Sequence, residues 1–198
     1  PSPSPTPTRT PRPLDPTPTP GPDSRFGVIL HTIEEEDGRP RYMNTAEESY
    51  FLNQLGVEWF IDGNYLITPP RGTHRVMFIG SFNNIIAGEN GPTMDELEEL
   101  AQVNPGAVWL VANEPNRRPG YEVLNILDDL HDSYAAIKAG DPTARIMSPP
   151  MLNWLFTCAG CSPGFTRGTD WAEEFRIEYF YRFGEEPPVD IWAINAYP

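Results

Sequence analysis

The feature that most constrains the fold of this chain is a short apolar run at residues 107–112, which ends just before a carboxylate. The run follows Gly106 and is rich in β-branched and aromatic residues, so it predicts a fully buried strand. After Asn113 and Glu114, Pro115 has no amide hydrogen with which to continue the strand, and it biases Glu114 towards extended geometry. We therefore expect an extended Glu114 at the carboxyl end of the strand, where parallel α/β proteins place their active sites.

Strand and helix patterns alternate along the rest of the chain. Further apolar strand candidates lie at residues 25–31, 57–62, 74–80, 144–152 and 189–198. Helix patterns lie at residues 46–55, 94–103, 121–139 and 170–183, whereas residues 34–38 are a hydrophilic loop and residues 63–73 hold no good helix pattern. Strands that alternate with helices predict an α/β fold with a parallel sheet.

Cap residues mark the ends of the expected helices. Asn44, Thr93 and Thr169 are expected to begin helices, and Gly56 and Gly140 to end them. The clearest helical period is that of residues 121–139. The residues expected on its buried face are Val123, Leu124, Ile126, Leu127, Leu130, Tyr134 and Ile137.

Two parallel architectures compete for this alternation, a doubly wound sheet and a (β/α)8 barrel. A doubly wound sheet normally carries a glycine-rich nucleotide loop after its first strand, and Gly27 lacks the required companions. A barrel typically needs about 250 residues, which is more than residues 25–198 supply. We therefore expect one domain at residues 25–198, a partial (β/α)8 TIM-type barrel of about six βα units.

Polar and aromatic side chains stand at the ends of several expected strands. His31 ends the first strand, Asn64 follows the second, and Asn195 and Tyr197 end the last. Because the carboxyl ends of a parallel barrel share one face, we expect these side chains to converge with Glu114.

Residues 1–24 are almost entirely Pro, Ser and Thr and form a linker. Alternating Pro-Thr and Pro-Ser favours polyproline II with nothing to bury, so this segment is expected to be disordered and to act as a semi-rigid spacer to other domains. Such tracts commonly tether extracellular domains, so we expect a secreted or cell-surface protein. No signal peptide is visible in residues 1–198, and an export signal, if one exists, is expected upstream of Pro1. No stretch of about 18 apolar residues predicts a membrane span.

The balance of charge limits the partners of the chain. Its formal net charge of −14 argues against a nucleic-acid partner, because such partners normally require a clustered basic surface. Neutral glycans remain compatible with this charge. Aromatic residues make up 12% of the chain, and rigid rings commonly line carbohydrate clefts, although most such rings are simply core.

The two cysteines, Cys158 and Cys161, stand as Cys-Ala-Gly-Cys in a loop after the fifth strand. One such pair supplies at most two zinc ligands, and with three His in the chain a complete metal site is not expected. A thioredoxin-type role is disfavoured because the pair does not open a helix after the first strand. We expect a disulfide, no metal and no cofactor.

Three segments resemble clan A glycoside hydrolases, which are (β/α)8 barrels. Residues 109–116 are similar to the fourth strand of that clan, where an Asn-Glu pair follows a buried strand. Residues 145–149, Arg-Ile-Met-Ser-Pro, look like the fifth strand of its smaller members, particularly the endo-β-1,3-glucanase type. Residues 190–198 resemble the sixth strand, with Asn195 at the usual His position.

The resemblance implies a retaining glycoside hydrolase that acts on a β-glucan-like polysaccharide. Glu114 would be its general acid/base and Asn113 would hold the sugar 2-hydroxyl. Retaining enzymes need a second carboxylate about 5 to 5.5 Å away as nucleophile, and in this clan it ends strand seven, which is expected beyond Pro198. Residues 1–198 alone are therefore expected to be inactive. Asp62 is expected to bind substrate or make a structural hydrogen bond.

The remaining expected sugar contacts are His31, Asn64, Asn195, Tyr197 and Trp154. Trp154, just past the fifth strand, either walls the cleft and stacks on a sugar or belongs to the core. Two functions remain open: the hydrolase, and a non-catalytic barrel that binds glycan or mediates surface attachment, in which Glu114 is a solvated loop carboxylate. Fold alone does not separate them.

Overall fold

The computed structural model describes residues 27–30, 33–34, 39–62, 69–79, 92–117, 120, 122–155 and 166–196. The expected linker and several expected site residues lie outside these ranges. They are His31, Asn64, Cys158, Cys161 and Tyr197.

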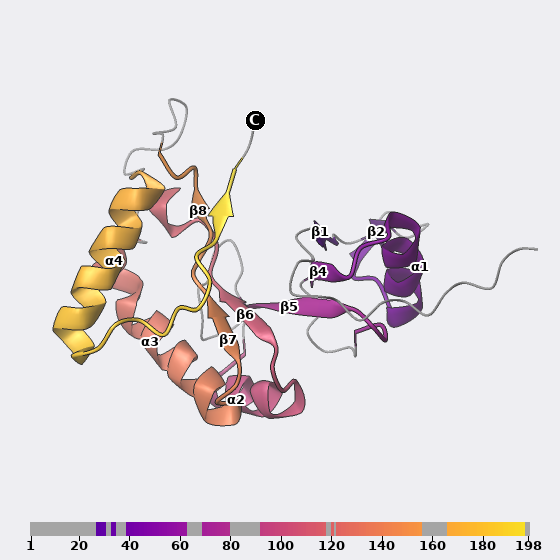
Figure 1. Ribbon diagram of the computed structural model, residues 1–198, viewed down its shortest axis with the longest axis horizontal. Coiled ribbons are helices and arrows are strands. Elements are labelled where there is room, and N and C mark those ends of the chain that lie inside the picture. The colour runs from indigo at the N-terminus through magenta and orange to yellow at the C-terminus, as the bar shows by residue number, and fades with distance from the viewer. Residues whose placement is uncertain are drawn as a thin grey trace, which may run out of the picture.

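The fold is α/β and is built on a five-stranded sheet in which all neighbouring strands are parallel (Figure 1). Its strands are β1 (Gly27–Ile29), β4 (Trp59–Asp62), β5 (His74–Ile79), β6 (Val108–Val111) and β7 (Arg145–Met147). They follow one another across the sheet in chain order. The prediction of an α/β fold with a parallel sheet is confirmed.

The predicted fifth strand, residues 144–152, is wrong as a single strand. It divides into β7 and β8 (Met151–Leu152), and β8 pairs in parallel with β9 (Ile194–Asn195) in a separate two-stranded sheet. The break falls at Pro149 and Pro150, which have no amide hydrogen for a ladder. The expected sixth strand is correspondingly short and continues towards β7 only as a parallel bridge between Met147 and Ile191.

A small antiparallel pair, β2 (Ile33–Glu34) with β3 (Pro40–Arg41), lies after the first strand. The sequence does not predict this pair, because a strand of two residues is too short to show an alternating apolar pattern.

Four α-helices connect the strands in the described part of the chain. They are α1 (Thr45–Leu55), α2 (Met94–Val103), α3 (Val123–Gly140) and α4 (Gly168–Phe183). The expected starts of α1 and α2 are confirmed, because Asn44 and Thr93 each form a capping box with the glutamate three residues on. Gly56 ends α1 with a φ of 65°. No helix among the described residues combines the length and the apolar character needed to cross a membrane.

Three details of the helices differ from the prediction. Gly140 is the last helical residue of α3 and not the residue after it. The residue before α4 is Arg167, so Thr169 lies inside the helix and does not cap it. Leu124, which was expected on the buried face of α3, is 64% exposed. The other six residues expected on that face are buried.

One face of the sheet carries the main core. Side chains alternate between the two faces of a strand, and the register pairs Met77 with Trp109 and Trp109 with Ile146 on this face. These side chains pack with buried residues of α2, α3 and α4 in a single apolar cluster. In Figure 1, α3 and α4 run along the side of β6 and β7.

The first helix contacts the same face of the sheet. Arg75 precedes Met77 by two residues and so shares its face. Its guanidinium is buried and lies 3.3 Å from the carboxylate of Glu48 on α1. Arg75 also lies over the ring of Phe60, 5.3 Å from its centroid. All four described helices therefore contact one face.

The opposite face holds a second apolar cluster. Its buried members are Val76, Val108 and Leu110. Partly buried residues pack around them, and none of these belongs to a described helix: Trp59, Ile61, Phe78, Met147 and Ile191. The sheet is therefore apolar on both faces, as expected for a parallel sheet.

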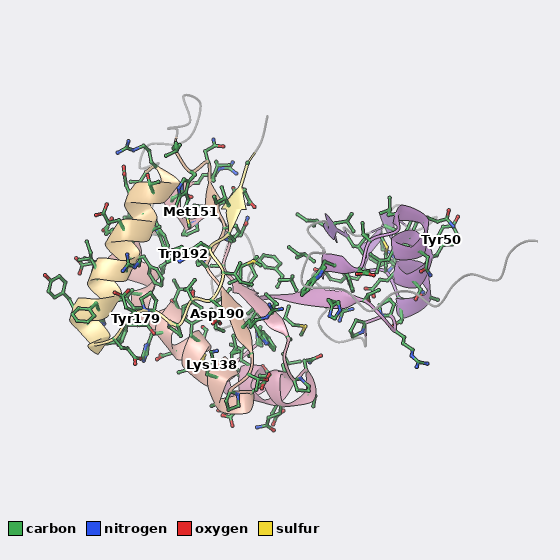
Figure 2. The ribbon with its side chains drawn as sticks, in the orientation of Figure 1. Tyr50, Lys138, Met151, Tyr179, Asp190 and Trp192 are labelled. Atoms are coloured by element: carbon green, nitrogen blue, oxygen red, sulfur yellow. The ribbon has the colours of Figure 1, made fainter. Side chains whose placement is uncertain are left out.

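The last described segment is anchored at the amino end of β7. Asp190, labelled with Lys138 in Figure 2, accepts a hydrogen bond from the Ile146 amide at 2.8 Å and lies 3.7 Å from the Lys138 ammonium. These contacts set residues 190–195 alongside β7 and β8, so that the chain reaches β9 in parallel orientation.

Gly140 marks a close approach between α2 and α3. A Cβ at this position would clash with the carbonyl oxygen of Glu98 and would lie 2.8 Å from the Cβ of Ala101. The contact explains why a glycine, which costs about 1 kcal/mol in a helix, stands in the last turn of α3.

We expect Gly140→Ala to lower the free energy of unfolding by about 1 to 3 kcal/mol, because the added methyl group overpacks the contact. Urea unfolding measures the change. The exposed Ala139→Gly serves as control and should cost about 0.5 to 1 kcal/mol through backbone entropy alone. A Gly140→Ala protein that is more stable than the parent would contradict the close approach.

Candidate active site

The chain leaves β6 through a kinked backbone and not the extended one expected from Pro115. Ala112 has a φ of 68° and Glu114 a φ of 48°, so the expectation of an extended Glu114 is wrong. Two backbone hydrogen bonds hold the kink: the Ala112 amide donates to Ile79, and the Glu114 amide donates to Pro150, both at 2.9 Å. Left-handed conformations of non-glycine residues cost about 1 to 3 kcal/mol each and cluster at functional sites.

Asn116 fixes the turn that follows. It lies in the 3-10 turn Pro115–Arg117 and is 1% exposed. Its side-chain amide donates to the carbonyls of Leu152 and Thr166 at 2.9 Å each, and its side-chain oxygen accepts from the Leu152 amide at 2.9 Å. One side chain thus connects the end of β6 with β8 and with the segment that precedes α4.

The carboxylate of Glu114 is buried, with only 2% of the residue exposed. Its Oε1 accepts a hydrogen bond from Nδ2 of Asn195 at 2.9 Å, and its Oε2 lies 3.1 Å from Nη1 of Arg117. The Arg117 side chain is 48% exposed. A buried carboxylate therefore has a fixed amide on one oxygen and a half-exposed cation on the other.

Asn195 also orients Asn113. The same Nδ2 of Asn195 donates to Oδ1 of Asn113 at 3.1 Å. Because that bond engages the Asn113 oxygen, the NH₂ group of Asn113 remains the group it can present to a ligand, and an amide NH₂ is a donor. The site therefore offers a donor beside the carboxylate of Glu114.

Parallel pairing explains how residues so far apart in sequence meet. Asn195 lies on β9, which pairs with β8, and the Asn153 amide donates to the Asn195 carbonyl at 3.0 Å. Ser148 is buried and accepts a hydrogen bond from the Ala193 amide at 2.9 Å. The carboxyl ends of β6, β8 and β9 are thereby brought together, and Figure 1 shows β8 and β9 side by side.

The structure brings together three of the residues expected from sequence, Glu114, Asn113 and Asn195. Trp154 lies at the same ends of the strands, but its partly buried side chain packs against the main apolar cluster, which supports the core alternative. Asp62 is the last residue of β4. The expected contacts of His31, Asn64 and Tyr197 and the Cys158–Cys161 disulfide stay predictions outside the described residues.

Two further residues that sequence reasoning did not single out also shape the site. They are Asn116 and Arg117. The spacing of Arg117 could have indicated its contact with Glu114. Arg117 stands three positions after Glu114, and in a 3-10 turn residues three positions apart lie on the same side. The role of Asn116 depends on backbone groups 36 and 50 residues away, which local sequence does not reveal.

The described residues contain no group of three or more His, Cys, Asp and Glu side chains arranged to hold a metal ion. Comparison of the chain with protein-family models gives no match, and comparison with curated proteins gives none either.

We expect Asn195→Ala to lower the free energy of unfolding by about 1 to 3 kcal/mol, because the buried Glu114 carboxylate loses a hydrogen bond that water does not replace. Urea unfolding measures the loss. The matched control is Asn125→Ala, since Asn125 donates at 2.7 Å to the exposed carboxylate of Glu122, and its loss should stay within about 0.5 kcal/mol. An equal loss of unfolding free energy in the two variants would contradict the expectation that burial of Glu114 strengthens its hydrogen bond with Asn195.

Proposed function

We propose that this chain is part of a secreted or cell-surface retaining glycoside hydrolase, similar to clan A enzymes, that acts on a β-glucan-like polysaccharide. The observation that carries the proposal is the buried Glu114 carboxylate at the carboxyl end of a parallel strand, held by Asn195 and beside Asn113. Strained backbone at Ala112 and Glu114 supports a functional site at this place.

A partial (β/α)8 barrel is the architecture we propose for the domain at residues 25–198. Its support is that the five strands are parallel and lie in chain order, whereas a doubly wound sheet reverses its order at a switch point. All four described helices contact one face of the sheet, and the other face carries its own small apolar cluster. In a closed barrel this second face becomes the packed interior.

In the proposed reaction, protonated Glu114 gives its proton to the leaving glycosidic oxygen and then, ionised, activates a water molecule. Asn195 keeps Oε1 in place through both steps. Arg117 is half exposed, so its guanidinium can leave Oε2 without moving the backbone and free that oxygen for the substrate. The nucleophile would be a second carboxylate about 5 to 5.5 Å from Glu114, on a seventh strand outside residues 1–198.

Asn113 is the proposed partner of the sugar. Its NH₂ group is available as a donor because Asn195 engages its oxygen, which suits a hydroxyl oxygen such as that at C2. Asn195 occupies the position of the usual clan A His. The hydrogen bonds that its side-chain amide donates to Asn113 and to Glu114 support a role in orienting both residues.

The setting of the enzyme is also a proposal. The Pro-, Ser- and Thr-rich linker at residues 1–24 suits a tether between this domain and others outside the cell. A disulfide between Cys158 and Cys161 would fit that oxidising location.

In a form of the protein that includes the proposed seventh strand, we expect Glu114→Gln to lower turnover of natural β-glucan by about 10² to 10⁴-fold, the usual contribution of general acid-base catalysis. Glycosyl transfer from dinitrophenyl glycosides should persist because their leaving group needs no protonation. Azide should rescue the slow second step, since it needs no general base. Steady-state and burst kinetics measure these rates.

Asn113→Ala is the comparison variant for this experiment. It should slow natural and dinitrophenyl substrates alike, because its contact is with the sugar and not with the leaving group. Hydrolysis of natural polysaccharide by Glu114→Gln at the parent rate would exclude Glu114 as the acid/base and leave glycan binding as the function.

Non-catalytic glycan binding is the second candidate, and a groove on α4 favours it. The groove has a volume of about 330 Å³ and includes Phe180 and Tyr181. These rings are 51% and 79% exposed, and the ion pair of Arg176 with Glu186 lies beside them. Exposed rings flanked by charged hydrogen-bonding groups suit the apolar faces and hydroxyl rims of sugars.

If this groove binds glycan, Tyr181→Ala should weaken binding of a β-1,3-glucan pentasaccharide by about tenfold or more, measured by isothermal titration calorimetry. Tyr50→Ala is the matched control: Tyr50, labelled in Figure 2, is 60% exposed on α1 and should not affect binding. Binding that is equal in both variants would exclude the groove.

A further inference from the structure

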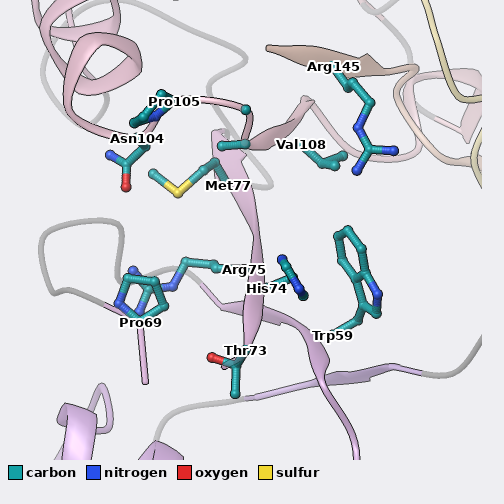
Figure 3. A pocket seen from close by; sticks show the side chains of 12 residues that line it. Trp59, Pro69, Thr73, His74, Arg75, Met77, Asn104, Pro105, Val108 and Arg145 are labelled. Atoms are coloured by element: carbon teal, nitrogen blue, oxygen red, sulfur yellow. The ribbon is translucent and has the colours of Figure 1, made fainter. Parts of the chain in front are cut away.

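A cavity of about 180 Å³ lies at the amino ends of the strands (Figure 3). Its lining includes Trp59 and His74, the first residues of β4 and β5, and Val108 and Arg145, the first residues of β6 and β7. Because the strands are parallel, this is the end of the sheet opposite to the one that carries Glu114. The cavity is therefore separate from the candidate active site.

The charge of this cavity is opposite to that of the chain. Of the twelve described residues that line it, three are basic, His74, Arg75 and Arg145, and none is acidic. The whole chain has 28 acidic residues against 14 Lys and Arg. A basic lining in so acidic a protein favours a negatively charged ligand.

Arg145 is held ready for such a ligand. Its guanidinium lies 5.8 Å from the ring centroid of Trp59, and that ring stacks on His74 with centroids 4.7 Å apart and an interplanar angle of 26°. Figure 3 shows the Arg145 side chain directed towards Trp59 and His74. No carboxylate in the described ranges pairs with Arg145. An arginine that is positioned by an aromatic ring keeps its planar set of donors for an oxyanion.

The charged groups around the cavity already have other partners. Arg75 pairs with Glu48. Asp141 accepts from the Gly106 amide at 2.6 Å and from Thr143. Asp190 accepts from the Ile146 amide and faces Lys138. These contacts leave Arg145 and His74 as the groups that can bind a ligand.

We propose that this cavity binds a small tetrahedral oxyanion, a phosphate or sulfate group, between Arg145 and His74. Guanidinium binds such oxyanions in bidentate fashion, and the cavity has room for a group of this size. The proposal does not rest on the hydrolase activity, because no residue of the Glu114 site lines the cavity.

The test is nuclear magnetic resonance titration of the chain with inorganic phosphate and with sulfate, at ionic strength held constant with chloride. The Trp59 indole and Arg145 Nε–H signals are expected to shift in a saturable way at millimolar concentrations, and Arg145→Gln should weaken binding by about tenfold or more. Glucose 6-phosphate, as a further arm, distinguishes a phosphate ester, which should bind at least as well, from a site that admits only the free ion.

Two controls keep the outcome clear. Arg176→Gln removes an exposed arginine on α4, and Glu114→Gln alters the other end of the strands, so neither should change the affinity for phosphate. Arg145 is exposed, so its replacement should leave the remaining amide signals and the unfolding midpoint in place. Shifts that do not saturate, or that persist in Arg145→Gln, would mean an adventitious ion only and would overturn the proposal.

Discussion

The parallel pairing of β5, β6 and β7 is the constraint on which the rest of this structure depends. It sets the register in which the alternating side chains of neighbouring strands share a face, so that Trp109 enters the core shared with the helices while Val108 and Leu110 enter the second cluster. It also sets all carboxyl ends at one edge of the sheet. The two candidate sites lie at opposite ends of the strands because the strands share one direction.

The carboxyl edge combines strain with polar cross-links. Positive φ angles at Ala112, Glu114 and Asn153 each carry a cost of about 1 to 3 kcal/mol. The side-chain hydrogen bonds of Asn116 and Asn195 connect this backbone to β8 and β9. Each such bond contributes a net stabilisation of about 1 kcal/mol, so together they offset backbone strain of this magnitude. A buried carboxylate is thus held in one position by groups from distant segments, which is the preorganisation that acid-base chemistry needs.

The two ends of the strands differ in chemistry, and each end follows from a few residues. At the carboxyl end, Asn195 brings together an amide donor and a carboxylate, an arrangement that suits a neutral, hydroxylated ligand. At the amino end, Trp59 contacts both Arg145 and His74, and the lining holds no carboxylate to match the charge of Arg145. The two sites share no residue, so a substitution at one end of the strands need not alter the chemistry of the other.

The sequence by itself determined the α/β class, the buried strand before Glu114 and the starts of α1 and α2, because apolar period and capping are local properties. Only the tertiary structure decided the rest. The turned backbone at Glu114 follows from hydrogen bonds to Ile79 and Pro150, and β8 pairs with β9 and not with a strand of the main sheet. The sequence also predicted that Asn195 converges with Glu114, but only the tertiary structure decided the hydrogen bond between these residues, which are 81 positions apart. The bonds of Asn116 to Leu152 and Thr166, 36 and 50 positions away, have no signal in the local sequence. Such bonds depend on strand order and register, which bring distant segments side by side and are not local properties.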